Sequence, residues 1–143
     1  MKILHIADLH LRGLSRHDEI RAISEDLFKK TQNQSIDQIL IAGDVFHTKT
    51  TGITAEYIDL LSWLLNELSR IAPVAITLGN HDFAQNNLTR QDAVSPIVSA
   101  LNNPRITLYK QSGNFNLNLK QIKLISLFIM DVFKVLKLKL IGY

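Results

Sequence analysis

The first 110 residues alternate between short apolar runs and longer segments in which apolar residues recur at helical spacing. The runs at residues 2–7, 38–42 and 74–78 end in polar residues, as buried parallel strands often do. Segments 18–30 and 54–71 repeat apolar residues every three or four positions, which predicts two amphipathic helices. The alternation is typical of a parallel sheet with right-handed crossovers. We therefore expect an α/β fold with helices flanking the sheet.

The pattern weakens after residue 80. Pro96 would begin a short helix capped by Ser95, and residues 105–110 have the composition of a strand. Residues 115–119 alternate apolar and polar side chains, which indicates a half-buried strand. From residue 132 onward the pattern fits neither helix nor strand.

We therefore expect two parts in the chain. Residues 1–113 would form the N-terminal part of a domain, and residues 114–143 would form an irregular, basic and apolar tail. Ser15 is the expected N-cap of the first long helix. The tail resembles what a truncated or frameshifted reading frame leaves behind.

Composition excludes several classes of protein. The chain has 143 residues, 46% of them hydrophobic and 20% charged, which suits one domain with a packed core. It has no cysteine, which excludes a disulfide framework, a zinc ribbon and a cysteine nucleophile. The apolar stretch at 124–130 is too short to span a bilayer, so we expect no membrane association and an intracellular protein.

The sequence pI of about 9.3 invites a nucleic-acid interpretation, but the charge is unevenly placed. Residues 1–113 carry 11 Lys or Arg against 12 Asp or Glu, whereas residues 114–143 carry 5 Lys against 1 Asp. The basicity belongs to the tail, and it gives no support to a DNA-binding surface on the main body.

Three clusters of metal-capable residues follow the predicted strands: Asp8-Leu9-His10, residues 43–47 and residues 79–82. Asp44 lies 36 residues after Asp8, and Asn80 lies 36 residues after Asp44, so each interval fits one βαβ unit. The carboxyl ends of parallel strands meet at one edge of a sheet, so these side chains are expected to converge there. Carboxylate, imidazole and amide ligands without thiolate suit manganese, iron or zinc.

Each cluster also has an ordinary interpretation. Asp8 could cap a loop, Gly43-Asp44 could be a plain turn, and His47 could be a surface residue. Three such clusters in the same topological position favour a metal site over three coincidences. Asp44 could then bridge two ions about 3.5–4 Å apart, as in two-metal phosphoester hydrolysis.

The segments KILHIADLHLRG and ILIAGDVFH, with Gly-Asn-His-Asp at 79–82, resemble the first three motifs of the calcineurin-like metallophosphoesterases. Within that superfamily they resemble the SbcD branch, the nucleases of double-strand-break repair and phage recombination. The residues after Asp44 are Val-Phe-His, whereas the protein phosphatases usually show a Val-Asp-Arg-Gly type of sequence. The resemblance covers about residues 1–110. It implies metal-dependent phosphodiester hydrolysis of DNA in the cytoplasm of a bacterial or phage-infected cell.

The resemblance also implies residue roles and two divalent metal ions, most simply Mn²⁺. Asp8 and His10 would bind the first ion, Asp44 would bridge both, and Asn80 would bind the second. His81 would be catalytic, beside the scissile phosphate. The resemblance further implies that Asp82 orients His81 and that His47 faces the nucleic-acid backbone. Arg12, Arg16 and Lys49 follow the first two motifs in predicted loops, where they either contact phosphates or are solvated loop residues.

The resemblance fails in one respect. The family pattern continues with further metal-binding histidines, but the five histidines of this chain end at His81. The capping region and the segment that docks the SbcC-type ATPase, the expected partner of a full-length member, have no counterpart either. We therefore expect weak metal binding and little or no nuclease activity from this chain alone.

Trp63 lies off the apolar stripe of its predicted helix. Either it lies on a neighbouring loop or it marks a partner surface, and the resemblance implies a homodimer through helices around it. Two other functions stay open: a metallophosphoesterase acting on a small phosphodiester or a phosphoprotein, and a non-catalytic fragment that only binds a partner.

Overall fold

The computed structural model describes residues 2–12, 15–47, 53–82, 91–110, 123–128 and 137–141. The predicted strand at 115–119 lies outside these ranges. The described elements alternate strand and helix through the first seven and then add two strands. In chain order they are β1 (Lys2–Ala7), α1 (His17–Thr31), β2 (Gln38–Ala42), α2 (Ala55–Ile71), β3 (Val74–Thr77), α3 (Ser95–Leu101), β4 (Ile106–Tyr109), β5 (Lys123–Phe128) and β6 (Lys137–Ile141).

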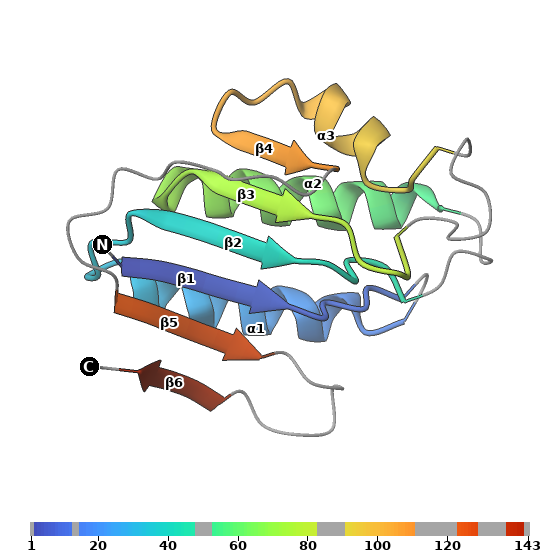
Figure 1. Cartoon of the computed structure of the whole chain (residues 1–143). Coiled ribbons are helices and arrows are strands. Elements are labelled where there is room, and N and C mark those ends of the chain that lie inside the picture. The colour runs from blue at the N-terminus through green and yellow to red at the C-terminus, as the bar shows by residue number, and fades with distance from the viewer. Residues whose placement is uncertain are drawn as a thin grey trace.

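The strands form one sheet in the order β4-β3-β2-β1-β5-β6 (Figure 1). The first five run parallel, and β6 runs antiparallel to β5. The register places Ile6 beside Ile41 and Ile41 beside Ile76, so β1, β2 and β3 end at the same edge. The α/β fold with a parallel sheet and flanking helices is therefore confirmed.

Segment 114–143 contributes two strands to this sheet, where the sequence suggested an irregular tail. β5 pairs in parallel with β1, from Lys2 beside Lys123 to Ala7 beside Phe128. The physical reason is the apolar run KLISLF, which suits a strand with a neighbour on each side. The boundary expected after residue 113 itself falls outside the described residues.

Alternation along the strands decides which face of the sheet is covered. Leu4, Ile6, Ile39, Ile41 and Ile76 are 0–1% exposed. The residues between them in β1, β2 and β3 are mostly half-buried. Figure 1 shows α1 and α2 together behind one face of the sheet, with α3 beside β4. The core therefore lies between the sheet and the apolar faces of α1 and α2.

Two helix starts differ from the sequence prediction. Arg16, not Ser15, precedes α1, and it adopts a left-handed conformation with φ 68°. Ser95 is the first residue of α3 rather than its cap. The carboxylate of Asp92 accepts hydrogen bonds from the backbone N–H groups of Val94 and Ser95 at 3.0 and 2.6 Å. A carboxylate has more acceptor sites than a hydroxyl and carries a charge that the helix N-terminus favours.

Trp63 packs within the chain. Its ring lies 5.8 Å from that of Phe28 in α1, and the Arg21 guanidinium lies 4.6 Å above it. Trp63 therefore packs on another part of its own chain, but that part is the helix α1 and not the neighbouring loop that was expected. The homodimer around Trp63 stays a prediction. Among the helices in the described ranges, none combines the length and apolar character that a membrane crossing requires.

Candidate metal centre

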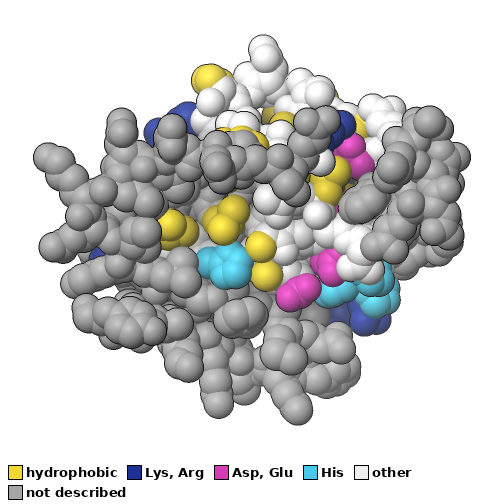
Figure 2. Space-filling view, in the orientation of Figure 1, with side chains coloured by type: hydrophobic (Ala, Val, Ile, Leu, Met, Phe, Trp, Pro, Cys, Tyr) yellow, Lys and Arg dark blue, Asp and Glu magenta, His cyan; other side chains and the backbone are white. Residues whose placement is uncertain are grey.

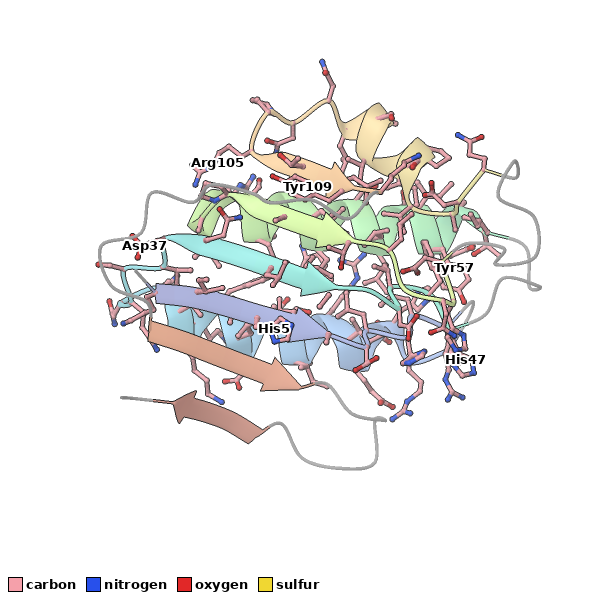
Figure 3. All side chains as sticks on the ribbon, viewed as in Figure 1. His5, Asp37, His47, Tyr57, Arg105 and Tyr109 are labelled. Atoms are coloured by element: carbon pink, nitrogen blue, oxygen red, sulfur yellow. The ribbon has the colours of Figure 1, made fainter. Side chains whose placement is uncertain are left out.

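Asp8, His10 and Asp44 come together where β1 and β2 end. One ligand atom from each lies within 4.8 Å of the others. Figure 2 shows acidic and histidine side chains gathered at this edge of the molecule. Figure 3 places His47 at the same edge and Asp37 at the opposite end of the strands. The convergence that the strand ends predicted is therefore present for these three residues.

The backbone at all three residues lies in the left-handed region. The φ angles are 54° at Asp8, 43° at His10 and 49° at Asp44. A side chain in this region costs free energy, less for aspartate than for most residues, and such costs cluster at functional sites. Holding these three side chains where β1 and β2 end, an edge that we call the rim, therefore costs conformational free energy.

The loop after β1 is fixed to the loop after β2 by backbone hydrogen bonds. The His10 N–H donates to the Asp44 carbonyl at 2.9 Å, and the Leu11 N–H donates to the Val45 carbonyl at 2.9 Å. From α2, the buried Tyr57 hydroxyl donates to the Leu11 carbonyl at 3.0 Å. Helical spacing places Tyr57 on the apolar face of the 54–71 helix, but it does not reveal where a phenol directs its hydroxyl.

The loops after β2 and β3 touch through two glycines. A Cβ built on Gly79 would lie 2.1 Å from Asp44 Oδ1 and 2.2 Å from the Asp44 backbone nitrogen. A Cβ on Gly43 would lie 2.8 Å from the Gly79 Cα. The close approach lets the His81 N–H donate to Asp44 Oδ1 at 3.0 Å. The signal in the sequence is a glycine directly before Asp44 and before Asn80.

Three imidazoles form a cluster beside these carboxylates. The His10 ring lies 5.6 Å from that of His47 and 5.1 Å from that of His81. His81 Nδ1 lies 2.7 Å from the His47 carbonyl. A carbonyl only accepts, so the hydrogen-bond network assigns the proton to Nδ1 and leaves His81 Nε2 for other chemistry.

Within the described part of the chain, His10 Nδ1 is buried and has no hydrogen-bond partner. His10 Nε2 lies 3.9 Å from Asp8 Oδ1. A buried polar atom without a partner is costly, and a metal ion would satisfy an imidazole nitrogen among carboxylates. The donor set of two carboxylates and one imidazole therefore fits a divalent cation that accepts oxygen and nitrogen ligands.

Asp82 is not the partner of the His81 ring. Its side chain is 2% exposed and accepts hydrogen bonds from the Phe46 N–H at 3.0 Å and the Gly79 N–H at 2.9 Å. The role expected of Asp82 at His81 Nδ1 is filled by the His47 carbonyl. Burial raises the pKa of Asp82, against the lowering effect of these amides.

The remaining predicted residues have different surroundings. Asn80 is exposed in the turn after β3. Arg12 is half-buried, and its carbonyl accepts a hydrogen bond from His17 Nε2 at 2.7 Å. Arg16 is half-buried and pairs with Glu19 at 2.8 Å. Lys49 lies outside the described residues.

Known proteins are similar to this chain over about two thirds or more of its length. The model of the calcineurin-like phosphoesterase family matches residues 1–139. An uncharacterized protein of Acanthamoeba polyphaga mimivirus is 38% identical over 115 residues, 78% of this chain and 8% of that protein. The SbcD component of the nuclease SbcCD from Bacillus subtilis is 36% identical over 104 residues, 68% of this chain and 25% of the relative. The DNA double-strand break repair protein Mre11 of Methanopyrus kandleri is 31% identical over 103 residues, 68% of this chain and 22% of the relative.

The chain thus spans a quarter or less of the length of these relatives. The matched residues include all three clusters at the strand ends. Members of this family use divalent metals, in keeping with the Asp8, His10 and Asp44 group. The chain belongs to the calcineurin-like phosphoesterase family.

Proposed function

We propose that this chain binds divalent metal ions, Mn²⁺ in the first place, in order to hydrolyse phosphodiester bonds of DNA. The observation that carries the proposal is the convergence of Asp8, His10 and Asp44 within 4.8 Å, on a chain of a family that uses such metals. His10 adds support, because its buried Nδ1 has no hydrogen-bond partner among the described residues and its Nε2 lies 3.9 Å from Asp8 Oδ1.

In this proposal Asp8, His10 and Asp44 hold the first ion, and Asp44 and Asn80 hold the second. Two bound ions would supply Lewis-acid stabilisation of the phosphate and a nucleophilic water at neutral pH. His81 donates Nδ1–H to a backbone carbonyl, and its protonated Nε2 can deliver a proton to the leaving oxygen. His47 and Arg12, on neighbouring loops of the rim, would contact the DNA backbone.

DNA is the proposed substrate because two relatives are a component of a nuclease and a DNA double-strand break repair protein by name. Pairing with an SbcC-type ATPase and dimerisation near Trp63 belong to the same proposal. The proposal covers the site that this chain carries, and full catalytic power would require further metal ligands beyond His81.

A Mn²⁺ titration followed by electron paramagnetic resonance tests the site. Asp44→Asn should weaken Mn²⁺ binding by about tenfold or more, because it removes a charged ligand. Asp37→Asn is the matched control, since Asp37 is an exposed aspartate directly before the same strand at the opposite edge of the sheet. Asp37→Asn should leave Mn²⁺ binding within about twofold of the native value. Equal affinities for both variants would refute the metal site.

The substrate class is tested with a fluorescent linear DNA and a chromogenic phosphodiester, each with Mn²⁺. DNA binding that requires Mn²⁺ and is lost in Asp44→Asn supports the proposal. Hydrolysis of the small diester without any DNA binding would instead place the chain with phosphoesterases of small substrates.

A further inference from the structure

The carboxylate of Asp82 joins two of the loops that build the rim. Oδ1 accepts the Phe46 N–H, next to His47, and Oδ2 accepts the Gly79 N–H, next to Asn80. Phe46 and Asp82 are separated by 36 residues along the chain. One buried side chain therefore fixes the loop after β2 against the loop after β3.

Asp82 is itself held firmly by its main chain. Its N–H donates to the Gly79 carbonyl at 3.1 Å, and its carbonyl accepts from the Ala93 N–H at 3.0 Å. Hydrogen bonds to an ionised acceptor are stronger than neutral ones, and buried N–H groups that lose their acceptor are costly. A fixed backbone with two such bonds gives the carboxylate little freedom to shift.

The loops after β2 and β3 are in close backbone contact where they meet. The glycines at 43 and 79 approach so closely that a Cβ on either would clash with the other loop. On the same interface the His81 N–H bonds to Asp44 Oδ1, and the His81 ring bonds to the His47 carbonyl. A small change in the spacing of the loops would therefore change the position of Asp44 relative to His81.

We propose that Asp82 is a positioning residue that sets the spacing between Asp44 on one loop and Asn80 and His81 on the other. The inference rests on the proposed function, because this spacing is the one that the shared second metal ion requires. It assigns Asp82 no direct contact with metal or substrate.

Asp82→Asn tests the role, because it keeps the shape but replaces one accepting oxygen with a donating amide. Either Phe46 or Gly79 then loses its acceptor. Asp92→Asn is the matched control: Asp92 is 7% exposed and also accepts two backbone N–H groups, but those belong to Val94 and Ser95 at the start of α3. A merely structural role for Asp82 predicts that the two variants behave alike.

Mn²⁺ titration of both variants gives the first measurement. Asp82→Asn should weaken Mn²⁺ binding by about 10-fold to 100-fold, the usual effect of losing a residue that supports metal ligands. Asp92→Asn should stay within about twofold of the native affinity at a comparable loss of thermal stability. Native affinity in a folded Asp82→Asn variant would overturn the proposal.

Amide hydrogen exchange measures the loop spacing without metal. In Asp82→Asn the amides of Phe46, Gly79 and His81 should exchange about tenfold faster or more, while that of Ile41 in β2 is unchanged. Unchanged exchange at these three amides would also overturn the proposal. If native protein binds no Mn²⁺, the proposed function fails, and the exchange data still decide whether Asp82 fixes the loops.

If Asp82→Asn does not fold, Asp82→Glu tests the same positioning role. Glutamate keeps two acceptors but moves them by one methylene, so a positioning role predicts a folded protein with Mn²⁺ binding weakened by about tenfold. Native Mn²⁺ affinity in Asp82→Glu would contradict the proposed spacing role.

Discussion

Replacing Gly79 with alanine adds a single methyl group at the tightest contact between the loops after β2 and β3. The new Cβ would lie 2.1 Å from Asp44 Oδ1, 2.2 Å from the Asp44 backbone nitrogen and 2.7 Å from Asp44 Cγ. Ordinary contact starts near 3.4 Å, so the atoms must separate by about 1 Å or more. Rotation of the Asp44 side chain cannot relieve the clash, because the backbone nitrogen is equally close. The loops themselves must move apart.

Forcing such a group into a packed site usually costs about 1–3 kcal/mol. We expect Gly79→Ala to lower the free energy of unfolding by an amount in that range. If the movement also makes the free energy of Mn²⁺ binding less favourable by about 1.4 kcal/mol or more, Mn²⁺ affinity falls by about tenfold or more. Urea unfolding measures the first effect, and a Mn²⁺ titration followed by electron paramagnetic resonance measures the second.

Ile76→Val is the control for Gly79→Ala. Ile76 lies on β3, three residues before Gly79, and it is 0% exposed. Losing one buried methylene there should cost about 0.5–1.5 kcal/mol of stability without changing Mn²⁺ affinity. The reasoning is refuted if Gly79→Ala keeps both native stability and native Mn²⁺ affinity, or if Ile76→Val weakens Mn²⁺ binding as much as Gly79→Ala does.

Two further substitutions test the backbone strain at Asp8 and the contribution of the Asp92 charge to stability. Asp8→Gly should raise the unfolding free energy by about 0.5–1 kcal/mol, because Asp8 has φ 54° and a side chain 45% exposed. The same change should weaken Mn²⁺ binding by about tenfold or more, because it removes a charged ligand. Lower stability than that of Asp8→Asn would contradict the strain argument. Burial acts to raise the pKa of Asp92, but hydrogen bonds from Ser95 and the charge of Lys110 outweigh it, and the pKa lies below its ordinary value of 3.8. Ionised Asp92 therefore contributes stability above about pH 4 that disappears as the pH falls through the folded-state pKa, and urea unfolding should show a smaller acid dependence in Asp92→Asn than in native protein.

The local pattern of apolar and polar residues predicted the strands that bury one face against the helices. The runs at 2–7, 38–42 and 74–78 became β1, β2 and β3 within a residue, because consecutive apolar residues bounded by polar ones leave few alternatives. The convergence of Asp8, His10 and Asp44 was predictable for the same reason. Parallel strands that end in polar residues necessarily present them at one edge.

Contacts set by tertiary structure were not predictable from spacing. Nothing local in KLISLF indicates that β5 pairs with β1. The resemblance implied that Asp82 orients the His81 ring, whereas its carboxylate bonds to Phe46 and Gly79. A charged group takes whichever buried donors the fold brings within reach, and sequence distance does not reveal them.

The position of β1 between β2 and β5 has a consequence for biosynthesis. Residues 2–7 leave the ribosome before residues 123–128, which form one of the two strands beside them, and more than a hundred residues separate the two segments. Until then one side of the nascent β1 presents unpaired backbone groups, which are a template for joining another polypeptide. Chaperone supply and translation speed should therefore govern how much of this polypeptide escapes aggregation in the cell.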